Sequence, residues 1–304
     1  MPATLQAFIA IFFLGALLRS SGLLVKIHAE RLAFVVFSIS LPATILVSLD
    51  RVVFAPTAWK LPLAACLVTL SMLFCSWPVA RLLHLPRATR GGFLLGTGCI
   101  NSVYFAYPVV LATLGDKGLA QAILFDLGQT TLTLTVIYGL AVWHGARSAT
   151  ARSVMLRFVS SPPLWALCLS LLLTLLGLHL TGWLHDALTP IHLTTTPLAS
   201  LVLGLSISFS AVRRTWALAL LGVGMRMIGG LLLGFAVAYG LDLAGMERAI
   251  VILVAAMPSA VTAVIFATDT GLDEDLVTSI VALSICVGVA LLPWLPQLLF
   301  LLAG

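Results

Sequence analysis

Apolar segments of about 20 residues follow one another along almost the whole chain and are separated by short polar loops. A helix of this length is what crosses the hydrocarbon core of a bilayer. With 61% hydrophobic residues, the composition excludes a soluble globular protein. The sequence therefore predicts an all-α integral membrane protein with the lipid bilayer as its surroundings.

The pattern predicts about ten transmembrane helices and no soluble domain. The basic residues lie in short loops, so the formal charge of +5 does not indicate a nucleic-acid partner. The five Cys lie inside apolar segments without paired spacing, which favours small core residues over disulfides or metal ligands. The predicted spans are 4–24, 32–50, 58–83, 91–113, 118–143, 162–181, 190–210, 215–240, 247–268 and 275–302.

Lys and Arg are distributed unequally between the two sets of loops, with eleven on one side of the predicted membrane and four on the other. Because cytoplasmic loops carry the excess of positive charge, the first side is predicted to be cytoplasmic. Both termini are then extracytoplasmic, and the predicted location is the cell membrane, the inner or plasma membrane. The six His do not cluster, and we expect interfacial side chains for all of them.

The fourth span contains residues that disturb a helix. Asn101 and Ser102 stand next to each other in its middle, and Pro108 and Gly115 follow. In hydrocarbon every backbone N–H and C=O must be satisfied within the protein, so a broken helix is tolerated only where it is buried or lines a cavity. The stretch predicts an interrupted helix at a functional site.

The ninth span looks like the counterpart of the fourth. Ser102 and Gly115 are 13 residues apart, and so are Pro258 and Gly271, which gives an offset of 156 between the two stretches. The offset is 155 between the prolines of the second and seventh spans. Five spans per half is an odd number, so the second copy enters the membrane from the opposite side. The sequence predicts two inverted five-helix repeats, 1–146 and 147–304, whose broken helices 4 and 9 cross near the midplane.

The motif Asn101-x-x-Tyr104-x-x-x-Pro108, followed by Gly115, resembles the fourth span of the auxin efflux carrier family. Met257-Pro258-Ser259-Ala260 resembles its ninth span, Pro42 and Pro197 its kinked second and seventh, and Arg226 the basic position of its eighth. Ala106 departs from the family, which usually has Gly there.

The resemblance covers essentially the whole chain and implies a fold and an activity. It implies scaffold and crossover domains drawn from both repeats, an elevator-like movement and a carboxylate substrate such as auxin, malate or malonate. The family is related by fold to sodium/bile acid symporters. We therefore expect a secondary active transporter of a small organic anion, either proton-coupled or a uniporter.

A break in a helix exposes free N–H groups at the N-terminus of the second half, where the helix dipole favours an anion. The amide of Asn101 adds donors for a carboxylate oxygen. Ordinary helix packing is the alternative for such polar residues in a membrane. The predicted substrate-binding residues are Asn101, Ser102, Met257, Pro258, Ser259, Thr262 and Arg226.

Three further residues are predicted to form the wall of the site. Pro42 and Pro197 kink their helices and open space beside the crossover, although a kink alone is an equal alternative. Gln129 belongs to a polar face of the fifth span, where hydrogen bonding between helices is the alternative to contact with substrate.

Asp126 and Arg226 are charged residues predicted at similar depths inside spans, too far from the interface to snorkel. Charges in such places usually pair or serve an ion or substrate pathway. We predict that the two are coupled, with Asp126 carrying a proton and Arg226 binding a substrate carboxylate when it is released.

Other classes of function fit less well. The sequence contains no metal-protease, paired-carboxylate or nucleophile motif inside a span, so an enzyme is not expected, and no cofactor or metal is predicted. The breaks offer no carboxylate for a sodium ion, so we predict no obligatory sodium, with a sodium-coupled symporter as the alternative. A channel or sensor is the other rival. Whether the protein is a monomer or a homodimer stays open.

Overall fold

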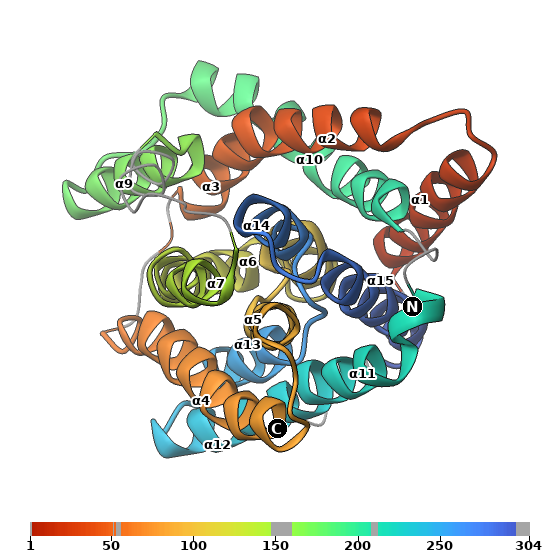
Figure 1. The fold of residues 1–304 in the computed structure, drawn as a ribbon. Helices are drawn as coiled ribbons and strands as arrows, with labels where there is room; N and C mark the ends of the chain where they lie inside the picture. The colour runs from red at the N-terminus through yellow and green to blue at the C-terminus, as the bar shows by residue number, and fades with distance from the viewer. Residues whose placement is uncertain (1, 51, 53–55, 147–159, 208–211, 296–304) are drawn as a thin grey trace. The chain divides into compact units, whose positions relative to one another are not determined.

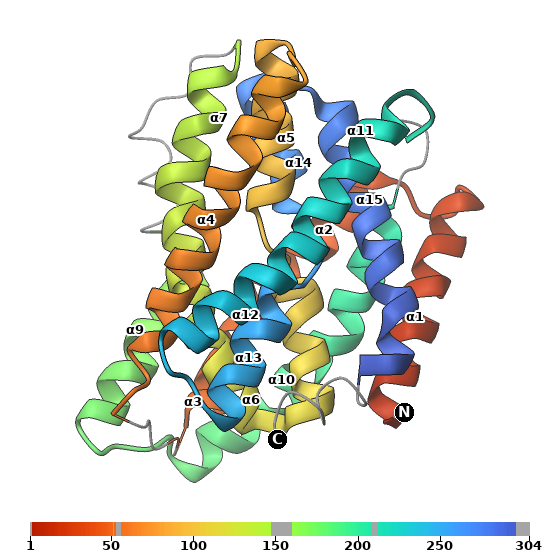
Figure 2. The ribbon, with the colours of Figure 1, turned by 90° about the horizontal axis from the view of Figure 1, so that it is seen from below.

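The computed structural model describes residues 2–50, 52, 56–146, 160–207 and 212–295. Every regular element in this part of the chain is a helix, and the only strand-like pairing in it is an isolated bridge between two loops (Figures 1 and 2). Seven of the described helices are long and apolar enough to cross a membrane. These features confirm the predicted all-α integral membrane fold with about ten spans.

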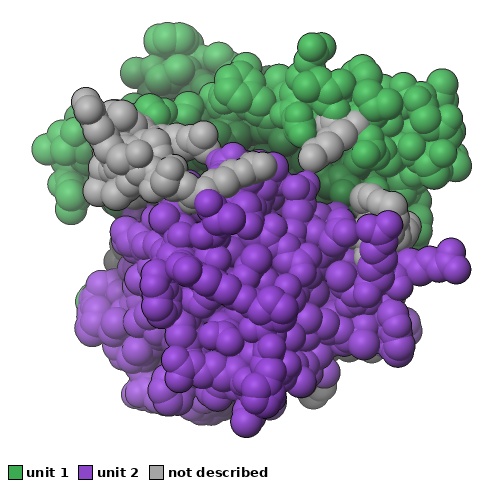
Figure 3. Space-filling view, viewed as in Figure 1, with its two compact units in different colours: residues 1–58, 103–123, 155–207 green, residues 59–102, 124–154, 208–304 purple. Residues whose placement is uncertain are grey.

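The chain forms two compact units, coloured green and purple in Figure 3, whose segments alternate along the sequence. The first unit comprises residues 1–58, 103–123 and 155–207, and the second comprises residues 59–102, 124–154 and 208–304. Each unit therefore takes segments from both halves of the chain. The repeat boundaries, 1–146 and 147–304, stay a prediction.

The first unit is built around the long contact between its first helix and α10. Gly15 of α1 and Gly204 of α10 face each other, and a Cβ on either would overlap the backbone of the other helix. These glycines let the two helices approach closely, an arrangement frequent in membranes. The helices wholly within this unit are α1 (Ala3–Ser20), α2 (Lys26–Val35), the π-helical turn η1 (Val36–Ser40), α3 (Leu41–Leu49), α9 (Pro162–Leu175) and α10 (Gly182–Ser206).

The second unit holds both breaks and the whole of the broken ninth span, whereas the fourth span passes into the first unit at Val103. Phe93 and Ile280 belong to its buried core, at which α5, α11 and α15 meet. The helices wholly within it are α4 (Lys60–Leu82), α5 (Arg87–Gly98), η3 (Thr133–Ile137), α7 (Tyr138–His144), α11 (Val212–Gly224), η4 (Met225–Gly229), α12 (Gly230–Gly240), α13 (Gly245–Ala255), α14 (Thr262–Thr270), α15 (Glu274–Leu291) and η5 (Leu292–Trp294). The turn η2 (Ser102–Ala106) and α6 (Tyr107–Leu132) run through both units.

Two glycines end the second halves of the broken helices. Gly115 has φ 66° and ψ −167°, and it divides α6 into the end of the fourth span and the start of the fifth. Gly271 has φ 72° and ψ 39° and ends α14 in the left-handed conformation. Both conformations favour glycine because it lacks a Cβ. The two residues paired by the 156-residue offset thus have the same local role.

Several boundaries differ from the sequence-based ones. The second span begins at Lys26 instead of residue 32. The seventh begins at Gly182 instead of 190, because α10 continues through Pro190 as well as Pro197. Neighbouring segments can satisfy the backbone groups that an internal proline leaves free. The basic loop between the halves falls mostly in residues 147–159, and the end of the tenth span in residues 296–304, outside the described residues.

Candidate functional site

The breaks in the fourth and ninth spans pair with each other through their backbones. Residues 99–101 separate α5 from η2, and residues 256–261 separate α13 from α14. The Asn101 N–H donates to the Pro258 carbonyl at 2.9 Å, and the Ala260 N–H donates to the Cys99 carbonyl at 3.2 Å. These bonds form an antiparallel bridge that satisfies backbone groups freed by the breaks. The structure brings the two interrupted helices together as the sequence predicts.

The side chain of Asn101 adds to this pairing. Its Nδ2 donates to the Ser259 carbonyl at 3.3 Å, and the residue is buried. The Ser259 N–H in turn donates to the Ser284 hydroxyl at 3.0 Å. Ser284 of α15 was not singled out from the sequence, because a serine in an apolar helix carries no distinctive spacing. It holds the second break in place from outside the motif.

Two buried hydroxyl groups at the breaks make no hydrogen bond in the described structure, namely Ser102 Oγ and Ser259 Oγ. A buried polar atom without a partner costs about 1–3 kcal/mol, so such atoms mark a place where a ligand or water can bind. Ser102 is the first residue of η2, which continues into α6, and α14 begins at Thr262, three residues after Ser259. Both hydroxyls therefore lie at helix N-termini, which favour an anion.

Arg226 is fully buried, within the π-helical turn η4. Its Nη1 donates to the Thr97 carbonyl at 2.8 Å, and its Nη2 donates to the Ala255 carbonyl. Thr97 lies in the last turn of α5, and Ala255 is the last residue of α13. The guanidinium thus contacts the C-terminal ends of both first half-helices. Sequence reasoning missed these partners because carbonyl groups have no signature in a sequence.

Asp126, the predicted partner of Arg226, accepts a hydrogen bond from the Thr130 hydroxyl at 3.3 Å, one helical turn further along α6. It is not among the hydrogen-bond partners of the Arg226 side chain, whose terminal nitrogens donate to carbonyls instead. The coupling of the two charges during transport stays a prediction.

Gln129 links three parts of the second unit. Its Oε1 accepts from the Thr69 hydroxyl of α4, and its Nε2 donates to the Gly98 carbonyl at 3.4 Å and to the Thr133 hydroxyl at 3.1 Å. Gly98 is the last residue of α5, so the amide contacts the edge of the first break. A role in the wall of a substrate site stays a prediction.

The other predicted site residues divide between the units. Met257 and Pro258 are buried in the second break, and Thr262 is half-buried at the start of α14. Pro42 and Pro197 belong to the first unit, at the start of α3 and inside α10. Among the described residues no group of three or more His, Cys, Asp or Glu side chains could hold a metal ion.

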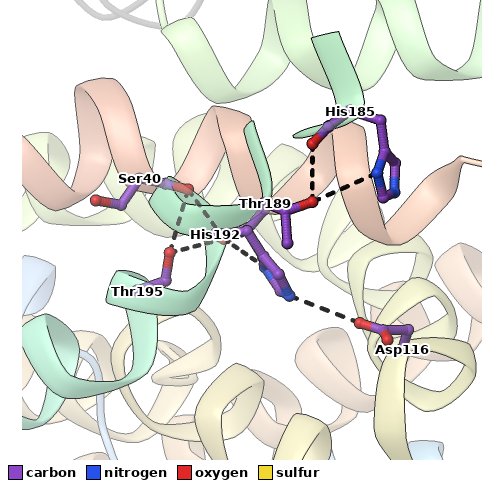
Figure 4. A network of polar contacts seen from close by, with 7 residues as sticks. Ser40, Asp116, His185, Thr189, His192 and Thr195 are labelled. Atoms are coloured by element: carbon purple, nitrogen blue, oxygen red, sulfur yellow. Dashed lines mark hydrogen bonds and ion pairs between the residues drawn. The ribbon is translucent and has the colours of Figure 1, made fainter. Parts of the chain in front are cut away.

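A buried polar network in the first unit was not predicted (Figure 4). His192 Nδ1 lies 3.2 Å from the Thr44 hydroxyl, and its Nε2 lies 3.7 Å from Asp116 Oδ1. The hydroxyls of Thr44 and Thr195 both donate to the carbonyl of Ser40, the last residue of the π-helical turn η1. The His192 side chain is only 5% exposed and packs within the first unit, while its expected position at the membrane interface stays a prediction. The run of threonines at residues 194–196, close to His192, is the sequence feature that could have indicated this network.

Helices broken in mid-span and paired through their breaks, within a bundle of apolar spans, define a multi-pass membrane transport protein. The profile of the family described as membrane transport protein matches residues 3–295. The chain belongs to this family, the auxin efflux carrier family that its motifs resemble.

Two similar proteins are archaeal and are named uncharacterized transporters. The one from Methanothermobacter thermautotrophicus is 31% identical over 294 residues, which cover 95% of each chain. The one from Methanocaldococcus jannaschii is 27% identical over 267 residues, which cover 85% of each chain. The shared class is a transporter, and their names give no substrate.

Proposed function

We propose that the protein is a secondary active transporter that moves a small organic anion with a carboxylate group across the cell membrane. The observation that carries the proposal is the pair of unpartnered buried hydroxyls, Ser102 Oγ and Ser259 Oγ, at the N-termini of two half-helices. Each N-terminus contributes about half a positive charge, and the amide of Asn101 stands beside them. A carboxylate supplies the acceptor oxygens and the negative charge that this arrangement lacks.

We propose alternating access by an elevator-type movement of the second unit, which holds both breaks. The inverted repeat, the extracytoplasmic termini and the inner-membrane location belong to the same proposal. Asp126 is the proposed proton carrier, since it is a half-buried carboxyl group within an apolar span. The alternative to proton coupling is a uniporter that uses the same substrate site.

The test is a thermal-shift screen of purified protein with auxin, malate, malonate and related mono- and dicarboxylates. A ligand that binds only the folded protein raises its melting temperature. Any acid that stabilises the protein is then tested in proteoliposomes, where a carrier gives saturable flux with counterflow. Ohmic flux without saturation would indicate the rival function, a channel. Chemical conversion of the acid would indicate an enzyme.

A further inference from the structure

The C-terminal ends of α5 and α13 meet at one positive charge. Each helix C-terminus carries about half a negative charge on its unpaired carbonyls. The Arg226 guanidinium, which stays protonated in proteins, donates to a carbonyl in each of these ends. The two C-terminal ends together carry about −1 elementary charge, which the positive charge of one guanidinium balances.

The surroundings of Arg226 are otherwise unusual for a fully buried arginine. Burial of a charge is costly unless it is paired and hydrogen-bonded. Within the described residues its terminal nitrogens donate to two carbonyl oxygens, and its Nε makes no hydrogen bond. The compensation for burial therefore comes from helix ends and not from a carboxylate.

A glycine one turn after Arg226 leaves room for the contact between Arg226 and the end of α13. Gly230 lies one turn after Arg226, and a Cβ on it would overlap the Ala255 carbonyl oxygen and crowd Arg226 Nη2. An ideal Cβ added to Gly224, at the end of α11, would meet no atom within 4 Å. Glycine at 230 is thus required by the approach of α13, while glycine at 224 is not.

We infer that Arg226 is a built-in counter-charge that holds the C-terminal ends of the two half-helices together. It is a positioning residue that acts through the backbone and does not bind substrate itself. This role competes with the predicted role of Arg226 as a carboxylate ligand, which stays a prediction.

The neutralisation of these helix ends also predicts a preference among substrates, and this prediction rests on the proposed function. With the C-terminal ends neutralised by Arg226, the N-terminal ends at Ser102 and Thr262 keep a combined charge of about +1. A site with this charge is balanced by one negative charge. We therefore expect monoanions to bind better than dianions of similar size.

The experiment compares Arg226→Lys, which keeps the charge, with Arg226→Gln, which keeps hydrogen-bond donors without it. Arg248→Gln is the matched control, because Arg248, in the first turn of α13, also donates to a carbonyl, that of Leu243, which precedes this helix. Hydrogen–deuterium exchange of the substrate-free protein is followed at the amides of Asn101 and Ala260, which form the bridge between the breaks.

We expect exchange at both amides to rise roughly tenfold or more in Arg226→Gln and to stay within about threefold of wild type in Arg226→Lys and Arg248→Gln. Low-millimolar guanidinium ion should restore protection in Arg226→Ala, whereas urea, which is neutral and of similar shape, should not. Wild-type protection in Arg226→Gln, or equal rescue by urea, would overturn the inference.

If the Arg226 variants fail to fold, Gly230→Ala provides the test, because its methyl group displaces the guanidinium from the Ala255 carbonyl. The amides of Asn101 and Ala260 must then exchange faster than in Gly224→Ala, and unchanged exchange would refute the inference. Because these measurements need no substrate, their outcome is independent of whether a carboxylate is transported.

Discussion

Asn101 is the residue at which the two breaks and the proposed ligand meet, and it is the only asparagine in the chain. Asn101→Ala removes one hydrogen bond to the Ser259 carbonyl, which contributes about 1 kcal/mol to stability. The backbone bridge from the Asn101 N–H remains, because alanine keeps this donor. We expect a folded protein whose melting temperature no longer rises with carboxylates.

The matched control is Thr113→Ala, which removes a hydroxyl that bonds within α6, to the Val109 and Val110 carbonyls. This variant should keep the full thermal shift with each acid. A normal carboxylate response in well-folded Asn101→Ala would remove the amide from the site.

Among the elements, the second halves of the broken helices end at two glycines whose conformations differ. The ψ of −167° at Gly115 lies in a region that is essentially closed to other residues, whereas Gly271 lies in the left-handed region that asparagine also tolerates. We expect Gly115→Ala to destabilise the protein by about 1–3 kcal/mol, and Gly271→Ala by about 1 kcal/mol. Asn at 271 should cost less than Ala.

These differences are measured by thermal unfolding of the purified variants. Gly139→Ala in α7 is the reference, because an ideal Cβ there meets nothing within 4 Å and no positive φ is required. It should be neutral or stabilising by up to about 1 kcal/mol. A Gly115→Ala protein as stable as this reference would show that the turn between the fourth and fifth spans does not need glycine.

For the whole molecule, transport driven by a proton gradient requires a group that binds and releases a proton. Asp126→Asn keeps the shape and the contact with Thr130 but cannot titrate. In proteoliposomes we expect carboxylate uptake by this variant to lose its stimulation by a pH gradient, while counterflow without a gradient continues. Asp186→Asn is the control, since the side chain of Asp186 is 86% exposed. Unchanged proton-driven uptake in Asp126→Asn would exclude this coupling role.

Sodium dependence is a second property of the whole molecule. The breaks present amide, hydroxyl and carbonyl groups, and two carbonyls in the helix ends beside them already accept from Arg226. Sodium sites need several oxygen ligands, usually including carboxylates. We expect the same uptake in sodium and in choline buffers. Uptake that falls to background in choline would favour a sodium-coupled symporter instead.

The sequence by itself determined the features that depend on local chemistry. Long apolar segments fix the membrane class because each helix must fit the bilayer on its own. The breaks at Asn101 and Pro258, and the glycines that end the following half-helices, are visible because such residues disturb or end a helix wherever they occur. Their common offset predicted that the two breaks belong together.

Only the tertiary structure decided which groups meet. The bond between Asn101 and the Ser259 carbonyl joins residues 158 positions apart, and the partners of Arg226 are carbonyls that every residue possesses. The contact of His192 with Thr44 likewise joins residues 148 positions apart. Side-chain periodicity reports which face of a helix is apolar, but the partner of a polar group depends on how distant segments pack, so the role of Arg226 could not be read from the sequence.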